Sequence, residues 1–340
     1  MASILVTGGA GYIGSHACKA LYRAGFTPVT FDNLSTGHAD AVRWGPLVRG
    51  DLLDREAVRA AFRVHRPIAV LHFAALSSVG ESVQHQNLYW SVNLGGAINL
   101  TEAAMEHGCR NIVFSSTCAT YGDHDGVVLD EDAAQEPINA YGASKRAVEE
   151  ILTNYSLSHG LRCVIFRYFN VGGADPDGEI GERHEPETHL IPLALQSAMG
   201  KHGPLVVFGS DYSTPDGTCV RDYVHVSDLA DAHVLGLKWL LSGGQRRIFN
   251  LGTGRGFSVR QVIQTAEDVV GGKVPVRWGD RRIGDAAQLV SGGQRAEQEL
   301  GWVPQRSSLH TMIVDAWRWE RIKAGLHPPL GASKASGDGN

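Results

Sequence analysis

The stretch ILVTGGAGYIG at residues 4–14 decides the fold. An apolar run leads directly into three glycines with the spacing G-x-x-G-x-x-G, and helix-forming residues follow at once. In this context Gly8 permits a tight turn, Gly11 lets the backbone approach a diphosphate, and Gly14 lets the helix pack closely on the strand. Three glycines alone could form an ordinary strand-to-helix turn, but the strand before them favours a dinucleotide site. We expect that site to include Gly8, Gly11, Tyr12, Ile13 and Gly14.

An acidic residue at the end of the second expected strand selects the form of the dinucleotide. The Asp32 carboxylate can accept hydrogen bonds from both ribose hydroxyls of adenosine, whereas it would repel a 2′-phosphate. The next arginine along the chain is Arg43. Asp32 could instead be only a turn-forming residue before Asn33, but after the glycine turn it favours NAD over NADP.

Short apolar runs alternate with helix-forming segments through the first half of the chain. The expected strands are 4–7, 28–31, 69–73, 111–115 and 163–168. The expected helices are 15–24, 55–65, 94–107 and 141–159. This alternation predicts an α/β protein with a doubly wound, Rossmann-like parallel sheet and a smaller C-terminal α/β lobe.

The second half is richer in loops and predicts a different role. We expect a dinucleotide-binding domain at 1–171 and a substrate lobe at 172–330, with an ordered loop at 209–218 over the ligand. Further strands at 224–226, before a helix cap at Ser227-Asp228, and at 248–251 predict that segments near 221–252 return to the first domain. The small, polar tail at 331–340 is expected to be disordered.

Composition excludes several classes of protein. The 340 residues are 43% hydrophobic and 20% charged, with a net charge of −5, which argues against a nucleic-acid or membrane surface. No secretory signal and no run of ~18 apolar residues is visible. Five cysteines without a C-x-x-C pair predict neither disulfides nor a zinc cage, and favour a reducing cytosol. We predict no metal site and expect the histidines to be packed or hydrogen-bonded; those considered are His16, His72, His225 and His233.

The segment YGASK at residues 141–145 predicts the catalytic base. Tyr141 and Lys145 are four residues apart, so they share one face of a helix. A tyrosine of pKa near ~10 needs a shift of about three units to act as a base at neutral pH. We expect the Lys145 cation, with the positively charged nicotinamide, to supply much of that shift. Thr117, at the end of an expected strand, is the natural hydroxyl partner, although it could only satisfy backbone there.

These residues resemble the extended short-chain dehydrogenase/reductase superfamily, and more closely the UDP-glucose 4-epimerases. The resemblance runs from Ile4 to about Trp302. The stretches that carry it include VTGGAGYIGSH, FDNLSTGH, HFAALSSVGESV, FSSTCATYG, YGASK, RYFNVGGADP, HLIPLAL and FGSDYSTPDGTCVRDYVHVSDLADAH. It implies a tightly held NAD, a UDP-hexose substrate and a homodimer joined through the Tyr141 helix and its neighbour.

The resemblance also implies two sets of binding residues. Beyond the glycine turn, those for the cofactor are Asp32, Asn33, Ser35, Gly37, Asp51, Leu52, Phe73, Ala74, Ala75, Ser77, Asn93, Ser115, Tyr141, Lys145 and Phe169. Those for the substrate are Thr117, Tyr141, Asn170, His189, Leu190, Val206, Phe208, Arg221, Arg282, Asp285 and Leu289. Arg221 and Arg282 suit a diphosphate, although each could be only a surface ion pair.

The implied reaction inverts carbon 4 of the sugar without net oxidation. Tyr141 removes the 4-hydroxyl proton while hydride leaves, and both return after the 4-keto sugar has turned its opposite face. Ser77-Ser78 stands where many members carry a lysine, so one cofactor contact is in doubt, and Ala286-Ala287 replaces a more usual apolar-Pro pair. Leu289 leaves open whether a 2-N-acetyl group fits.

Other functions on the same scaffold are weighed against this one. Nucleotide-sugar dehydratases place an Asp-Glu pair directly after the strand-end threonine, whereas Cys118-Ala119 follows here. A non-catalytic NAD-sensing regulator would be expected to lose Tyr141 or Lys145. We expect interconversion of UDP-glucose and UDP-galactose; UDP-xylose/UDP-arabinose and UDP-N-acetylhexosamines stay open.

Overall fold

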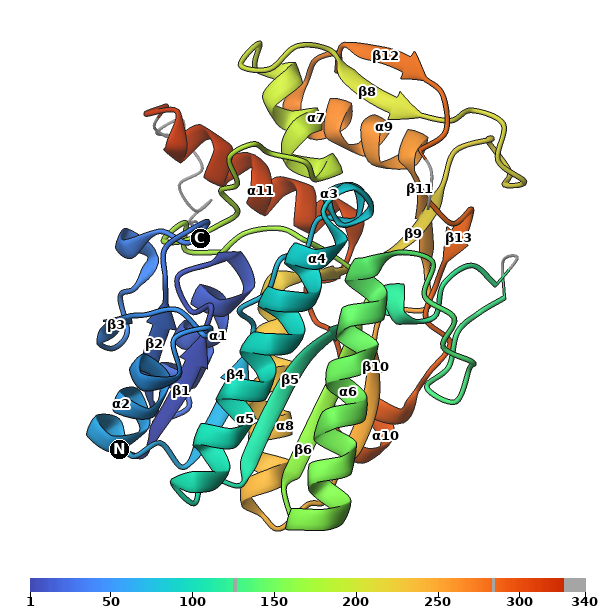
Figure 1. Ribbon diagram of the computed structural model, residues 1–340. Helices are drawn as coiled ribbons and strands as arrows, with labels where there is room; N and C mark the ends of the chain where they lie inside the picture. Colours follow the sequence, from blue (N-terminus) through green and yellow to red (C-terminus); the bar gives the residue numbers. More distant parts are fainter. Residues whose placement is uncertain (125–126, 283–284, 327–340) are drawn as a thin grey trace, which may run out of the picture.

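Figure 1 shows the computed structural model of the chain, which describes residues 1–124, 127–282 and 285–326. Its centre is a sheet of seven parallel strands. These are β1 (Ser3–Thr7), β2 (Thr27–Asp32), β3 (Leu47–Arg49), β4 (Ala69–His72), β5 (Asn111–Thr117), β6 (Arg162–Tyr168) and β10 (Arg247–Leu251). They lie in the order β10-β6-β5-β4-β1-β2-β3. The expected Rossmann-like α/β fold is confirmed.

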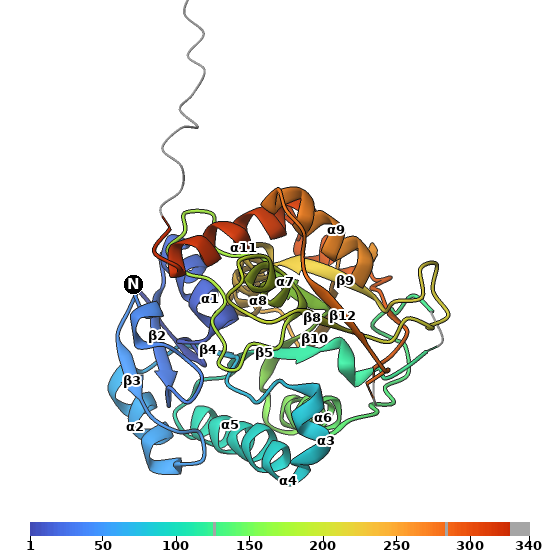
Figure 2. The same cartoon turned by 90° about the horizontal axis from the view of Figure 1, so that it is seen from above.

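Helices cover both faces of this sheet, as Figure 2 shows from above. One face carries α1 (Tyr12–Arg23) and α8 (Val226–Leu241); the other carries α2 (Arg55–His65), α5 (Gly96–Glu106) and α6 (Ala140–His159). Because side chains alternate along a strand, Ile4 and Val6 pack with α1 and α8, whereas Leu5 packs with α2, α5 and α6. This explains why the first strand is apolar at every central position.

The strand order reverses beside β1. From β1 the chain runs outward to β2 and β3, then crosses back to β4 and continues through β5 and β6. The loops after β1 and β4 therefore diverge from one point at the carboxyl edge of the sheet, where ligands bind in doubly wound folds.

The C-terminal lobe lies above that edge in Figure 1. Parallel strands β8 (Leu205–Phe208) and β12 (Val276–Gly279) pack with α7 (Leu190–Ala198), α9 (Val259–Val270) and α11 (Leu309–Lys323). A small sheet joins β11 (Gly256–Ser258), β9 (Val220–His225), β13 (Gln288–Leu289) and β7 (Asn170–Gly172). The remaining elements are η1 (Ala39–Ala41), α3 (Val79–Gln84), α4 (Gln86–Tyr89), the π-helix η2 (Trp90–Gly95), η3 (Cys118–Thr120) and α10 (Arg295–Leu300).

One local expectation needs correction. The cap of α8 is His225, whose Nδ1 accepts from the Ser227 amide at 3.0 Å, rather than Ser227-Asp228. The Asp228 carboxylate instead accepts hydrogen bonds from the backbone amides of Gln305 and Arg306.

The division into two domains stays a prediction. β10 joins the large sheet, whereas β9 belongs to the small one. The expected end of the lobe at 327–330 and the expected tail at 331–340 lie outside the described residues. Among the described residues, no helix is long and apolar enough to cross a membrane.

Candidate active site

Of the three glycines of the G-x-x-G-x-x-G pattern after β1, the fold requires two and leaves the third free of close contacts. Gly8 has φ +72°, and a Cβ there would lie 2.6 Å from the Ala74 nitrogen. A Cβ on Gly14 would lie 2.1 Å from the Gly8 carbonyl oxygen. A Cβ on Gly11 would meet only that oxygen, at 3.3 Å, and no other atom of the described residues lies within 4 Å. The backbone at Gly11 is therefore open to a ligand.

The start of α1 is suited to an anion. Gly11 is the N-cap residue in an extended conformation, and no side chain of the described residues caps the helix there. The first backbone amides of α1 thus lack a side-chain acceptor, and the positive end of the helix dipole lies at the open turn. Together with the space at Gly11, this arrangement fits the diphosphate of NAD.

The expected ribose-binding residues gather at the ends of β2 and β3. The Asp32 carboxylate accepts from the Ala10 amide at 3.0 Å and from the Leu34 amide at 2.8 Å. It is 8% exposed. Asp32 therefore forms the turn that was the alternative reading, and its fixed carboxylate still reaches the glycine turn. The Asn33 side chain donates to Asp51 at 2.9 Å, which brings these two expected contacts together.

Three further expected contacts lie around that turn. Ser35 donates its backbone amide to the Asn33 side chain at 2.9 Å. A Cβ on Gly37 would lie 2.9 Å from the Ala10 Cβ, so this loop folds closely over the glycine turn. Leu52, in contrast, is buried and packs in the core near α5.

The loop after β4 is held beside the glycine turn. The backbone amides of Phe73 and Ala74 both donate to the Thr7 carbonyl, and Ala75 follows them in the same loop. Asn93 is buried; its side chain accepts from the Leu76 amide at 2.8 Å and donates to the Ser144 hydroxyl at 3.1 Å. Asn93 therefore connects the loop to α6.

The replacement of the family lysine near Ser77 has a local structural consequence. Ser77 is exposed, and Ser78 accepts from the Glu81 amide at 3.3 Å as the cap of α3. The Ser78 carbonyl also accepts from the Tyr89 hydroxyl at 2.7 Å. Ser78 thus caps the start of α3, and Ser77 precedes it on the surface.

Helix α6 carries the expected base and its lysine toward β5. Asn139 caps α6 by accepting from the Gly142 amide at 2.9 Å. Lys145 is buried, and its Nζ donates to the Ser115 carbonyl oxygen at 2.8 Å. Thr117 lies close enough to Tyr141 to lower its pKa, and its hydroxyl accepts from the Ala119 amide at 3.1 Å. The three expected catalytic residues therefore lie together at the carboxyl end of β5.

The pKa values at this site differ from the sequence-based expectation. Burial raises the pKa of Tyr141 to about 12, although the hydrogen bond from Thr117 lowers it. Burial lowers the pKa of Lys145 to about 7, although the charge of Glu149 raises it. The expected assistance from Lys145 together with the positively charged nicotinamide stays a prediction.

A buried polar network that was not predicted from the sequence joins α6 to β5 and β6. The Glu149 carboxylate pairs with Arg167 at 2.6 Å and accepts from the Ser116 hydroxyl. Arg167 also donates to the Tyr121 hydroxyl at 3.0 Å. Glu149 lies one helical turn after Lys145, a spacing that could have revealed it.

The small sheet brings residues expected to bind the substrate close to a residue expected to bind the cofactor. Leu289 is the direct partner of Arg221 in the pairing of β13 with β9. Leu289 also packs on an apolar cluster that contains Cys118 and Phe169. Asn170 begins β7 and pairs with Tyr223 of β9. In the described part of the chain Arg221 has no ion-pair partner within 4.0 Å, so the surface ion pair considered for it is not formed.

Arg282 forms an ion pair, which was the alternative to diphosphate binding considered for it. Its Nε lies 3.0 Å from Asp285, and its guanidinium stacks 4.7 Å from the centre of the Phe208 ring. These three expected substrate contacts therefore meet, and Val206 lies in the same strand, β8. In the loop before β9, Tyr212 lies under Arg281 at 4.3 Å.

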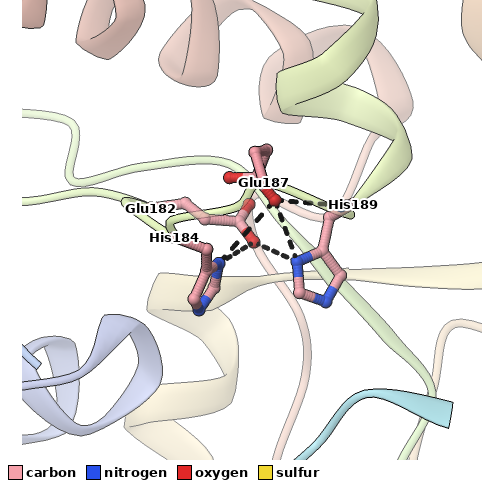
Figure 3. Close-up of side chains that lie close together, drawn as sticks. All are labelled: Glu182, His184, Glu187 and His189. Atoms are coloured by element: carbon pink, nitrogen blue, oxygen red, sulfur yellow. Dashed lines mark hydrogen bonds and ion pairs between the residues drawn. The ribbon is translucent and has the colours of Figure 1, made fainter. Parts of the chain in front are cut away.

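His189 belongs to a cluster of four side chains from one loop, shown in Figure 3. It precedes Leu190, the first residue of α7. Its Nδ1 lies 2.8 Å from Glu182 and 3.3 Å from Glu187. The sequence reasoning missed Glu182, His184 and Glu187, although E-x-H occurs twice, five residues apart.

Charges within this cluster shift its pKa values. Burial lowers the pKa of His189, but the carboxylate of Glu182 raises it to about 10. Burial also lowers the pKa of His184, and the two carboxylates raise it to about 9.

The histidines considered earlier are buried and bonded within the core. His16 and His233 contact the carbonyls of Tyr12 and Leu229, each one turn earlier in its helix. His72 bonds the Thr7 hydroxyl at 2.7 Å, and His225 reaches Asp315 at 3.3 Å. Each histidine therefore has at least one bonded ring nitrogen, whereas the Nε2 atoms of His16 and His233 are buried without a hydrogen-bond partner among the described residues.

Comparisons with known proteins agree with this geometry. Residues 4–252 match the NAD dependent epimerase/dehydratase family. The chain is 50% identical to the UDP-glucose 4-epimerase of Rhizobium leguminosarum bv. trifolii over 325 residues, 96% of this chain and 99% of that protein.

Two solved structures share the fold over nearly their whole length. One is UDP-glucose 4-epimerase from Brucella ovis in complex with NAD, at 47% identity and TM-score 0.90, covering 93% of this chain and 98% of that one. The other, from Stenotrophomonas maltophila with NAD and formylated UDP-arabinopyranose, has 39% identity and TM-score 0.92, covering 96% and 100%. The protein belongs to the NAD dependent epimerase/dehydratase family.

Proposed function

We propose that this protein is an NAD-dependent UDP-sugar 4-epimerase that interconverts UDP-glucose and UDP-galactose. The observation that carries the proposal is the arrangement at the carboxyl end of β5, where Thr117 lies beside Tyr141 and Lys145 donates to the Ser115 carbonyl. This arrangement accompanies a glycine turn that is open at Gly11. The relative from Rhizobium, half identical over nearly the whole chain, bears the same function as its name.

In this proposal the protein's residues orient the sugar and move one proton. Tyr141 accepts the proton of the 4-hydroxyl and later returns it, while the Thr117 hydroxyl holds the sugar oxygen within reach. The chemistry that NAD supplies when bound is reversible uptake of the hydride from carbon 4. Arg221 and Arg282 hold the diphosphate, so that the sugar alone turns between the two half-reactions.

The residues beside Thr117 argue against elimination. Cys118 and Ala119 begin the short helix η3, and the Cys118 thiol is buried with its pKa raised to about 12 by burial. Neither residue offers the carboxylic acid that a dehydratase needs to protonate a leaving hydroxyl. The site therefore favours removal and return of hydrogen at one carbon over elimination.

The test is incubation of the purified protein with UDP-glucose, without added reductant, followed by identification of the product. We expect UDP-galactose at equilibrium; a deoxy-keto sugar, carbon dioxide or unchanged substrate would contradict the proposal. Tyr141→Phe should reduce kcat by about 10²- to 10⁴-fold while NAD stays bound. Tyr22→Phe, at an exposed tyrosine of α1, is the matched control and should keep normal activity.

The sugar range and the assembly belong to the same proposal. UDP-arabinose is worth including in the substrate panel because the Stenotrophomonas maltophila structure holds a formylated UDP-arabinopyranose. We also propose a cytosolic homodimer joined through α6 and the continuous helix α4-η2-α5. Leu88 and Trp90 on that helix and Leu157 on α6 are exposed apolar side chains that such an interface would cover. A mass measurement in solution tests this; a monomer would refute the dimer alone.

A further inference from the structure

Four side chains of the loop before α7 converge on one point, and their role is not explained by the proposed reaction. They are Glu182, His184, Glu187 and His189, and Figure 3 shows the two imidazoles facing the two carboxylates. One ligand atom from each lies within 4.8 Å of all the others. We propose that this cluster, the loop cluster, binds one divalent transition-metal ion of the zinc type.

The distances match a tetrahedral site. The Nδ1 atom of His184 lies 3.3 Å from Glu182 Oε1 and 3.8 Å from Glu187 Oε1. The Nδ1 atom of His189 lies 2.8 and 3.3 Å from the same two oxygens. Zinc bonds of about 2.0–2.2 Å to nitrogen and oxygen give a tetrahedron with edges of about 3.3–3.6 Å. Four edges of the loop cluster therefore already lie near the required lengths.

Buried polar atoms without hydrogen bonds point to the same conclusion. His184 Nδ1 lies near two carboxylate oxygens but has hydrogen-bond geometry with neither, and it is shielded from solvent. Glu187 Oε2 is also buried without a hydrogen-bond partner, and the Glu187 side chain as a whole is only 5% exposed. Such unsatisfied atoms are costly and are rare in native proteins. A cation at the centre would supply the missing partner for the imidazole nitrogen.

The donor set suits zinc better than calcium or magnesium. Two imidazole nitrogens and two carboxylate oxygens are borderline ligands, whereas calcium and magnesium prefer six or more oxygens. The two carboxylates carry two negative charges, so with neutral imidazoles and a divalent ion the occupied site would be neutral. With four protein ligands the site is closed, which is typical of structural metals.

The second acidic cluster in this region serves as a contrast. Asp175, Asp177 and Glu179 also lie close together, but Lys19 occupies their centre, at 2.7 Å from Asp175 and 2.9 Å from Asp177. A lysine ammonium already balances those carboxylates. In the loop cluster, the ion-pair partners of the two carboxylates among the described residues are His184 and His189, so a divalent ion could replace the protons that these two imidazoles carry.

The location indicates what the metal would do. The Tyr12 hydroxyl donates to the Gly173 carbonyl at 2.6 Å, which ties the beginning of this loop to the start of α1. The charges of Glu182 and Glu187 help to raise the pKa of Tyr12, after burial, so both carboxylates act near the anion-binding turn. An ion in the loop cluster would cancel their repulsion toward a diphosphate and fix the entry to α7.

Metal binding can be measured on the whole protein without any assay of activity. Chelator-treated protein at about pH 8 is titrated with zinc in equilibrium dialysis, and cobalt is used as a spectroscopic probe. We expect one zinc ion per chain, with a dissociation constant below about 1 μM, and the strong visible absorption of tetrahedral cobalt. No binding at about 10 μM zinc, or a weak octahedral cobalt spectrum, would overturn the proposal.

Variants locate the ion. His184→Gln and Glu187→Gln should each weaken zinc binding by about 100-fold or more and abolish the rise in Tm that zinc causes. The controls His310→Gln and Glu185→Gln change exposed residues outside the loop cluster and should bind zinc normally. Undiminished binding in both ligand variants would refute the site. Circular dichroism checks that each variant is folded. The His184 side chain is more exposed than that of Glu187, so His184→Gln still tests the site if Glu187→Gln unfolds. The result is independent of whether the protein epimerises UDP-glucose.

Discussion

Replacing Gly11 with alanine separates the role of the glycine turn in folding from its role in binding. The backbone there has φ −82° and ψ 179°, which alanine adopts readily. The new Cβ would meet only the Gly8 carbonyl oxygen, at 3.3 Å. Alanine in place of glycine at this cap costs about 0.5–1 kcal/mol, and the stiffer unfolded chain returns about 0.4–1 kcal/mol. We expect the free energy of unfolding to change by less than about 1 kcal/mol.

The same methyl group should weaken NAD binding. It occupies the space through which the diphosphate approaches the backbone, and forcing a methyl group into a close contact costs about 1–3 kcal/mol. At 1.36 kcal/mol per tenfold, that is roughly a 5- to 150-fold loss of affinity. Gly14→Ala should behave differently, because its Cβ would lie 2.1 Å from the Gly8 oxygen and the backbone must move. We expect it to lower the stability by about 2 kcal/mol or more.

Urea unfolding and calorimetric titration of cofactor-stripped protein with NAD measure both effects. Gly80→Ala is the control, since nothing lies within 4 Å of a Cβ at that position in α3. It should change neither quantity substantially. A diphosphate site at Gly11 is contradicted if Gly11→Ala binds NAD within twofold of the parent protein, or if it unfolds as easily as Gly14→Ala.

Three further substitutions probe the buried charges of the site. Lys145→Met should abolish activity yet raise Tm at pH 7 by roughly 2–5 °C, because burying this amine with its pKa lowered to about 7 costs stability below pH 10. This cost in stability is fully present below pH 7 and disappears as the pH rises toward 10.5. If the gain in Tm at pH 7 were equal to the gain near pH 10.5, the lowered pKa of Lys145 would be contradicted. Glu149→Gln leaves the Arg167 cation buried without its partner and should cost about 3–5 kcal/mol in urea unfolding, whereas Glu150→Gln on the exposed face should cost little. Asp32→Ala should lower the preference for NAD over NADP in binding titrations; an unchanged preference would remove Asp32 from the ribose site.

The parts of the fold that could be predicted are those that local sequence determines. β1, the glycine turn and α1 are contiguous, and the central positions of β1, Ile4 to Val6, are apolar because helices cover both faces of the sheet. The spacing of Tyr141 and Lys145 fixes their shared face in the same local way. These features need no knowledge of distant segments.

The parts that escaped prediction depend on distant pairing or lack an apolar pattern. β3 has only three residues, none of them buried, and is defined by its pairing with β2. The small sheet joins β7 with β13, which are more than one hundred residues apart and meet only through β9. No local periodicity marks such strands, so the partners of Arg221 and Leu289 could not be read from the sequence.

The buried base and its lysine explain why this site depends on the charge of its ligand. With a pKa of about 12, Tyr141 loses its proton at pH 7 at a cost on the order of 7 kcal/mol. The Ser115 carbonyl holds Lys145 at the end of β5, but burial lowers the pKa of Lys145 to about 7, which weakens it as a source of positive charge. A positive charge placed beside both groups would favour the phenolate, and oxidised nicotinamide carries one. The protein therefore provides burial, hydrogen bonds and position, and the strength of the base depends on the cofactor whose diphosphate the glycine turn fits.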